Sequence, residues 1–465
     1  MKGKVYLIGC GPGPPDLLTV RAVNILKKSD VVLHDRLVDP KVLDHAGDVE
    51  KIDVGKMPGE SDKQEEINNL LHSKAKEGKT VARIKNGNPV IFGRGGEEVQ
   101  FLQERGVEVE VVPGLSSATS IPPLLGIPLT KRGISSSISI LTGIEAGGED
   151  PSWGGVGDTA VVLMTVGNLP KVVEKLLESG KSRETLAALV SSGASDDERL
   201  LLSPLSKVAE LAELAEISPP AILVSGEVVR ELLRLKGKKV AIFRPGREEK
   251  RTEKLVEKAG GIPMFYKVCE IEGSDKTELR KALEDDWDAL IFMSPNGARS
   301  AAGLVDFDRY KTVAVGNRTK AVLERFGAGG VITPKHQSSR GIEELLKEND
   351  WRSLALRSSL AEEKIEGAEN VTAYSVVPVD VDKTVKKYLD TAPEYSILTS
   401  SGILNFLMDT ASDEGLKENL KKKMNESFLM TMGRKTTKSA LDENLNVNFE
   451  LPKPDLKNFF EEVVP

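Results

Sequence analysis

Short apolar runs alternate with amphipathic stretches along the first half of the chain. Runs of strand length lie at 4–9 (KVYLIG), 31–34 (VVLH), 80–85 (TVARIK) and 109–114 (VEVVPG). Helical spacing is clearest after Ser61, where Gln64 three residues on completes a capping box and Gly78 marks the helix end. This alternation predicts an α/β fold built on a parallel sheet.

The pattern also predicts where the chain divides. A second α/β segment has expected strands at 137–143, 159–164 and 221–226, and a basic linker at 231–237 then leads into a new strand, KVAIFRPG. We therefore expect one domain at 1–230, with subdomains 1–132 and 133–230, and a separate domain at 238–465.

The second half contains an internal duplication. WDALIFMSPNGARSAAG (287–303) matches EYSILTSSGILNFLMD (394–409), and VAVGNRTKAVL (313–323) matches MTMGRKTTKSAL (430–441). Each repeat reads as a strand, a Ser/Gly-rich turn and a helix, followed by a second strand, Gly turn and helix. The duplication predicts two similar α/β domains facing a shared cleft.

Composition excludes several classes of protein. No apolar run approaches the roughly 18 residues of a membrane span, and the start MKGKVYLIG does not read as a secretory signal, so we expect a cytoplasmic protein. Two cysteines without a partner motif and four histidines never at metal-ligand spacing predict no metal site. A net charge of −7 offers no general attraction for nucleic acid.

The turn GCGPGPPDLLT (9–19) lacks the GxGxxG pattern, which disfavours a dinucleotide site. It is followed in order by LHDRLV (33–38), DVGKMPG (53–59), NGNPVIFGRGGEE (86–98), VVPGLSSA (111–118) and GIPLTKR (126–132). Together these segments resemble the uroporphyrinogen-III C-methyltransferases of the tetrapyrrole methylase family over residues 1–230. FGRGGEE is the most discriminating of them.

This resemblance implies two α/β domains that bind S-adenosylmethionine between them, release S-adenosylhomocysteine, and form a homodimer. The cofactor-binding positions it implies are Pro12, Asn86, Gly87, Asn88, Ile91, Ser116, Ser117, Met164 and Gly193. The family usually reads GGDP where this chain has Asn86-Gly87-Asn88-Pro89, so an amide replaces a carboxylate that would pair with the cofactor.

The same resemblance assigns Asp35 as proton acceptor and Lys56 as proton donor. Structural alternatives are a pairing of Asp35 with Arg36 and a carboxylate-binding role for Lys56. Uroporphyrinogen III carries eight carboxylates, which guanidinium groups bind bidentately. The implied substrate-binding residues are Arg94, oriented by Glu97, together with Lys131 and Arg132.

The duplicated half resembles uroporphyrinogen-III synthase over residues 238–465. That family cyclises hydroxymethylbilane with loss of water and inversion of the last pyrrole ring. By family position Tyr374 is the acid that assists loss of hydroxide; the alternative is a tyrosine that only packs between domains. The cleft-lining positions would be Ser294, Asn296, Gly316, Thr399, Ser400 and Ser401.

Family resemblance also implies that the chain crosses between the two synthase domains twice. Residues 238–268 would then pack with 377–465, and 269–376 would form the other domain. The segments 265–273 and 373–381 lie at equivalent places in the two repeats and would be the connectors. Tyr374 would sit at this hinge, facing the cleft.

Two rival functions remain open at this point. The first half could be a methylase of another substrate, such as a protein or an RNA, although no strongly basic face is evident for RNA. The second half could be a noncatalytic module that binds tetrapyrroles. Formation of the type III isomer from hydroxymethylbilane, rather than the spontaneous type I isomer, separates a synthase from such a module.

Overall fold

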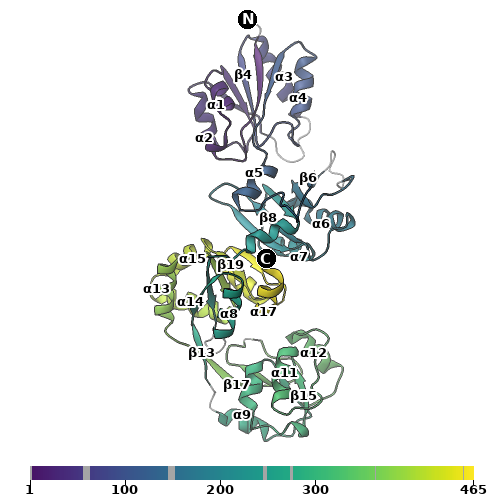
Figure 1. Cartoon of the computed structure of the whole chain (residues 1–465), viewed down its shortest axis with the longest axis vertical. Helices are drawn as coiled ribbons and strands as arrows, with labels where there is room; N and C mark the ends of the chain where they lie inside the picture. The colour runs from purple at the N-terminus through teal and green to yellow at the C-terminus, as the bar shows by residue number, and fades with distance from the viewer. Residues whose placement is uncertain are drawn as a thin grey trace. The chain divides into compact units, whose positions relative to one another are not determined.

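A computed structural model describes residues 3–55, 63–144, 152–244, 249–272, 276–361, 363–453 and 455–465. The chain divides into two compact units (Figure 1). The first contains residues 1–237, 258–261 and 428–465, and the second contains 238–257 and 262–427. The expected linker at 231–237 thus falls at the first division, whereas the last 38 residues join the first unit; the domain boundaries proposed from the sequence stay a prediction.

The first sheet of unit 1 is entirely parallel, with strand order β3-β2-β4-β1-β5. Its strands are β1 (Lys4–Gly9), β2 (Val31–His34), β3 (Glu50–Asp53), β4 (Thr80–Lys85) and β5 (Glu108–Val112). Neighbouring residues alternate between its faces, so that Val32 packs with the helices of one face and Val31 with those of the other.

Helices cover both faces of this sheet (Figure 1). Helices α1 (Val20–Leu26) and α2 (Pro40–Leu43) pack on one face, and α3 (Lys63–Lys76) and α4 (Gly95–Gln103) on the other. Helix α5 (Ser117–Leu124) follows β5. Ser61 of the expected capping box lies outside the described residues. Gln64 is buried, and its side-chain amide donates to Asn68 and Glu98.

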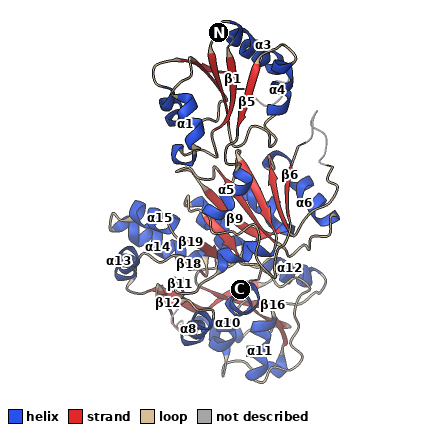
Figure 2. Ribbon diagram, turned by 45° about the horizontal axis from the view of Figure 1, so that its top comes forward, coloured by secondary structure: helices blue, strands red, loops and turns tan. Residues whose placement is uncertain are grey.

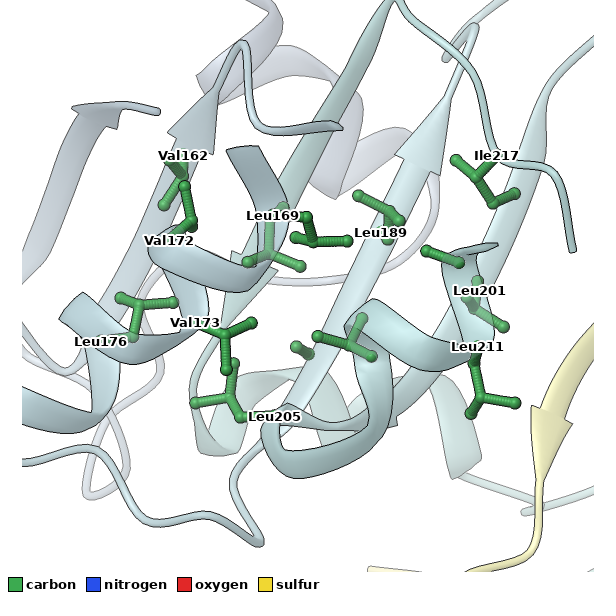
Figure 3. Packing of buried hydrophobic residues seen from close by; sticks show 14 of the residues in the cluster. Val162, Leu169, Val172, Val173, Leu176, Leu189, Leu201, Leu205, Leu211 and Ile217 are labelled. Carbon is green, nitrogen blue, oxygen red and sulfur yellow. The ribbon is translucent and has the colours of Figure 1, made fainter. Parts of the chain in front are cut away.

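The second sheet of unit 1 is mixed. Its strands are β6 (Ile138–Thr142), β7 (Thr159–Leu163), β8 (Leu186–Ser191), β9 (Arg199–Pro204) and β10 (Ala221–Ser225), in the order β6-β7-β10-β8-β9. Helices α6 (Leu169–Glu178) and α7 (Leu205–Leu214) bury Leu169, Val172, Leu205 and Leu211 against it (Figure 3). A 3-10 helix, η5 (Glu227–Leu233), stands where the sequence predicted a helical linker.

The C-terminal segment, defined as residues 428–465, also belongs to unit 1. It contains β19 (Phe428–Thr431), α16 (Arg434–Asp442), β20 (Val447–Glu450), the short helix α17 (Leu456–Asn458) and the π-helical turn η8 (Phe459–Val463). Strand β20 pairs in parallel with β19 and with β9.

Unit 2 contains two groups of strands (Figure 2). β11 (Lys239–Phe243) pairs in parallel with β12 (Ile262–Tyr266) and β18 (Tyr395–Leu398). The other sheet has the order β13-β17-β16-β14-β15, from β13 (Cys269–Glu272), β14 (Ala289–Phe292), β15 (Lys311–Ala314), β16 (Ser353–Ser358) and β17 (Glu369–Pro378). The described helices of unit 2 as a whole are α8 (Glu249–Lys258), α9 (Lys276–Leu283), α10 (Pro295–Ala301), α11 (Asn317–Arg325), α12 (Ser339–Lys347), α13 (Val381–Thr391), α14 (Ser401–Asp413) and α15 (Lys417–Asn425).

The two expected connectors of unit 2 lie side by side. β13 runs antiparallel to the end of β17, with Cys269 opposite Pro378 and Glu272 opposite Ser375. β11, from the opening of the first repeat, pairs with β18 of the second repeat rather than with β14 of its own. This pairing is the arrangement that an exchange between repeats requires.

Candidate functional site

Three loops meet at the carboxyl ends of parallel strands β1, β4 and β5. A Cβ atom added at Gly9 would lie 2.6 Å from the carbonyl oxygen of Gly87 and from the amide nitrogen of Gly114. One added at Gly114 would lie 2.4 Å from the same carbonyl oxygen. No side chain fits at these contacts, which explains the glycines. Ligands of open α/β sheets bind at this edge of the sheet.

The predicted cofactor residues of the first subdomain are gathered there. The backbone of Gly87 exchanges hydrogen bonds with Gly11, next to Pro12, at 2.8 and 3.2 Å. Gly87 has a φ of +66°, and a Cβ on it would lie 3.9 Å from both the Cα of Ser116 and the amide nitrogen of Ser117. Asn86 and Asn88 flank this glycine, and the amide of Ile91 donates to the carbonyl of Asn88.

Asn88 holds its own loop. Its Nδ2 donates to the carbonyl of Gly114 at 3.1 Å, and its Oδ1 accepts from the amide of Val90 at 3.1 Å. The two partners are of opposite type, so they fix the orientation of the amide group. An aspartate could make only the second of these bonds, so the asparagine adds a tie between the loops after β4 and β5.

The second subdomain reaches this site through two contacts. Gly193 of the second subdomain lies against helix α5, because a Cβ on it would be 2.7 Å from the Ile121 side chain. The same helix is capped by the buried Ser116, which accepts from the amide of Ala118. A Cβ on Gly13 would lie 4.0 Å from the carbonyl oxygen of Ala194. Met164 is 46% exposed at the end of β7 with a φ of +54°, and no contact with the described part of the first-subdomain loops is recorded for it.

Asp35 accepts a hydrogen bond from Arg83 Nη2 at 2.5 Å, and Lys85 Nζ lies 3.9 Å from its other oxygen. The observed partners thus come from β4, beside β2 in the sheet, rather than from the neighbouring Arg36. The Asp35 side chain keeps 33% of its surface exposed, so one face of the carboxylate can meet a substrate. Lys56 lies outside the described residues.

A buried charge network that the sequence reading missed supports Asp35. Arg83 and Lys85 are almost fully buried on one face of β4, and the fully buried Glu98 of α4 lies between them. Its Oε1 accepts from Lys85 Nζ at 3.0 Å, from Gln64 Nε2 at 3.1 Å and from Arg83 Nη2 at 3.4 Å. Burial alone would raise the pKa of Glu98, but the two cations outweigh it and lower that pKa.

Two of the predicted substrate-binding residues of this half, Arg94 and Lys131, already form ion pairs. Arg94 has a left-handed φ of +58°, is 47% exposed, and donates to Glu97 through Nε and Nη2 at 2.6 to 3.1 Å. The Glu97 carboxylate thereby raises the pKa of Arg94. Lys131 forms an ion pair with Glu231, which had not been anticipated, and Arg132 is exposed.

In the synthase half, Tyr374 of β17 is buried, with 6% of its surface exposed. Its phenolic oxygen accepts from Ser294 Oγ at 3.0 Å, while Ser294 Oγ accepts from the amide of Gly297 at 3.1 Å and caps α10. In this bond the serine hydroxyl is the donor, so its proton points to the tyrosine oxygen. The tyrosine proton is left free to donate.

The other predicted cleft residues lie at the starts of helices. Asn296 accepts from Arg299, and Ser400 and Ser401 open α14, whereas Thr399 Oγ1 donates to the Phe243 carbonyl. Gly316 precedes α11. A Cβ on this glycine would lie only 2.7 Å from Gln337 Oε1, which accepts from the amide of Asn317. Gln337 was not predicted.

In the described ranges, no cluster of three or more His, Cys, Asp or Glu residues could hold a metal ion, and no helix has the length and hydropathy of a membrane span. Burial raises the pKa of the Cys10 thiol to about 12 and that of Cys269 to about 11, so both thiols stay protonated.

The sequence matches two family models. One, Tetrapyrrole (Corrin/Porphyrin) Methylases, covers residues 4–209, and the other, Uroporphyrinogen-III synthase HemD, covers residues 250–461. These matches agree with the two resemblances inferred from the sequence.

Individual relatives resemble half of the chain. A uroporphyrinogen-III C-methyltransferase of Methanocaldococcus jannaschii is 42% identical over 50% of this chain and 99% of the relative. An S-adenosyl-L-methionine-dependent uroporphyrinogen III methyltransferase of Methanosarcina barkeri is 42% identical over 49% of this chain and 92% of the relative. A siroheme synthase of Azotobacter vinelandii is also 42% identical, but the match spans only 50% of its length. The chain belongs to the tetrapyrrole methylase family and carries a uroporphyrinogen-III synthase domain after its methylase domain.

Proposed function

We propose that the first half transfers methyl groups from S-adenosylmethionine to C2 and C7 of uroporphyrinogen III, which gives precorrin-2. The second half makes that substrate by closing hydroxymethylbilane to uroporphyrinogen III. The observation that carries the first activity is the convergence of the Gly9, Gly87 and Gly114 loops at the same sheet edge as the partly exposed carboxylate of Asp35, which follows the neighbouring strand β2. Family membership of each half supports the pairing of the two activities.

The residues present fit the cofactor. Gly87 leaves open backbone in front of Ser116 and Ser117, at the start of α5, where helix amides favour polar groups of a ligand. Met164 offers a half-exposed, polarizable surface beyond β7. When bound, the cofactor supplies an electrophilic methyl group on sulfur.

Residues of the chain position the substrate and remove its proton. With the cofactor bound, an electron-rich pyrrole carbon would take its methyl group as the carbon–sulfur bond breaks and S-adenosylhomocysteine leaves, and the tetrapyrrole would then lose a proton. Asp35 accepts that proton, because Arg83 and Lys85 hold its carboxylate in place and one face stays accessible. Arg94, held by Glu97 on its exposed loop, binds a substrate carboxylate, with Lys131 and Arg132 as further cations. We keep Lys56 as the proton donor.

Ring closure needs loss of hydroxide from the bilane. Tyr374 donates the proton to the departing hydroxyl, and the bond from Ser294 stabilises the phenolate oxygen as it forms. The turns at Ser294, Asn296, Gly316 and Thr399–Ser401 present helix amides to the substrate carboxylates. Two further parts of the proposal are a homodimer through the methylase half and a cytoplasmic location.

Replacing Arg94 with alanine is expected to lower kcat/KM for uroporphyrinogen III by about 10- to 100-fold, the cost of one charged hydrogen-bonding group at about 1.5–3 kcal/mol. The Kd for S-adenosylmethionine, measured by calorimetry, should stay within about twofold, because the hydrogen bonds of the Arg94 side chain within the described ranges go to Glu97 and not to the cofactor-binding loops.

The matched control is Arg105→Ala, since Arg105 is also on the surface of this domain but lies over the ring of Phe101. It should change neither constant. An Arg94→Ala enzyme that loses cofactor affinity and substrate turnover equally would contradict the assignment of Arg94 to the tetrapyrrole.

A further inference from the structure

One edge of the second methylase sheet is covered by a strand from the synthase half of the chain. Strand β9 is the last methylase strand of the sheet, whose order in unit 1 is β6-β7-β10-β8-β9-β20-β19, and without β20 its outer edge would expose unpaired backbone groups. β20 lies parallel to this edge with Phe449 opposite Leu202. These residues are far apart in sequence, so the strand at this edge comes from the last part of the synthase domain.

Asn448 fixes the register of the added strand. Its side-chain Nδ2 donates to the carbonyl of Leu200 in β9 at 3.0 Å. Its Oδ1 accepts from the amide of Leu429 in β19 at 2.7 Å. One half-buried side chain thus ties β20 to the strands on both of its sides.

Contacts outside the sheet join the same two parts. Arg434, at the start of α16, forms an ion pair of 2.8 Å with Glu210 of α7, and Leu441 packs on the apolar cluster under α6 and α7. Arg230 of η5 donates to the carbonyls of Glu462 and Val463 at 3.2 and 3.1 Å. Three methylase elements, β9, α7 and η5, therefore hold the C-terminal segment.

We propose that the C-terminal segment, residues 428–465, is an intrachain clamp that completes the second methylase sheet by strand addition and stabilises it. The exposed ion pair contributes little by itself, whereas the backbone pairing, the Asn448 bridge and the apolar contact act together on the same edge. With β20 on β9, that edge is closed to a second copy of the chain. A homodimer must then use another surface of the methylase domain. The inference concerns the fold of the chain and stands whichever substrates the two domains take.

Hydrogen exchange of the full chain tests the clamp. The variant Asn448→Ala with Arg230→Ala should speed exchange of the β9 peptide (199–204) by about tenfold or more, because the edge opens locally. The β14 peptide (289–292) should keep its rate. Asn349→Ala is the matched control, since Asn349 also bonds a backbone carbonyl, that of Leu345, but lies far from β9 in sequence and in unit 2.

Cross-linking tests the contact without destabilising the sheet. Glu210→Cys with Arg434→Cys should be joined by a short bifunctional maleimide in the folded chain, and neither single variant should be. The native Cys10 and Cys269 are buried and should not react. Absence of the cross-link would overturn the docking of the C-terminal segment on the methylase domain. A cross-link together with an unchanged hydrogen-exchange rate of β9 in the Asn448→Ala, Arg230→Ala variant would overturn its stabilising role.

Discussion

Tyr374→Phe is expected to lower the rate of enzymatic ring closure by about 10²–10⁴-fold, the usual contribution of a positioned general acid. The substitution removes only the hydroxyl that Ser294 orients and leaves the ring in its buried place. The measured quantity is the rate of uroporphyrinogen III formation from hydroxymethylbilane by the full chain. KM should change little, because the proton is needed in the transition state.

Tyr310→Phe is the control for this variant, since Tyr310 lies in the same sheet domain next to Arg309. It should keep the wild-type rate. In the Tyr374→Phe reaction the spontaneous type I isomer should dominate the product. Wild-type yield of the type III isomer from Tyr374→Phe would reduce Tyr374 to a packing residue.

Glu98→Ala is expected to destabilise the methylase domain by about 3–5 kcal/mol, because it removes the buried anion between Arg83 and Lys85 and leaves the two cations only the partly exposed Asp35. Urea unfolding followed by methylase-domain signals measures the loss. Glu104→Ala, on the exposed end of the same helix, should change stability by at most about 0.5 kcal/mol. A Glu98→Ala protein as stable as the control would show that the network carries no net stability.

The network also predicts a pH dependence. The pKa of Glu98 is lowered in the folded state, so its contribution is fully present above its unfolded value of 4.5 and is lost as pH falls through the folded value. Glu98→Gln should remove this contribution. Its stability should therefore fall less steeply than that of the wild type below pH 4.5.

The parallel sheet of the first subdomain could be predicted from the sequence because four of its five strands are short apolar runs separated by helical spacing, whereas β3 (EKID) is too polar and exposed to show this pattern. Strands β8 and β9 were not predicted, since LAALVS and RLLLSP do not show an alternation that separates strand from helix. The predicted strand 80–85 contained Arg83 and Lys85, but their burial could not be foreseen because Glu98 and Gln64 reach them from other elements.

The site residues were likewise predicted only in part. Motif order placed Asn86, Gly87, Ser116 and Ser117 in one proposed site, and the structure brings their loops together. It did not reveal that the Asn88 side chain bonds the Gly114 carbonyl, because motif order does not fix side-chain orientation, or that Glu231 pairs with Lys131, because Glu231 lies outside the motifs. The docking of β20 on β9 pairs residues more than 200 positions apart, which no local pattern encodes.

The central claim is that one chain makes uroporphyrinogen III and methylates it. It is tested most directly by giving the full-length protein hydroxymethylbilane and S-adenosylmethionine labelled in the methyl group, and separating the products by isomer and mass. We predict type III tetrapyrrole carrying two labelled methyl groups. Type I product, or unmethylated type III product with intact cofactor, would contradict the synthase or the methylase assignment, respectively.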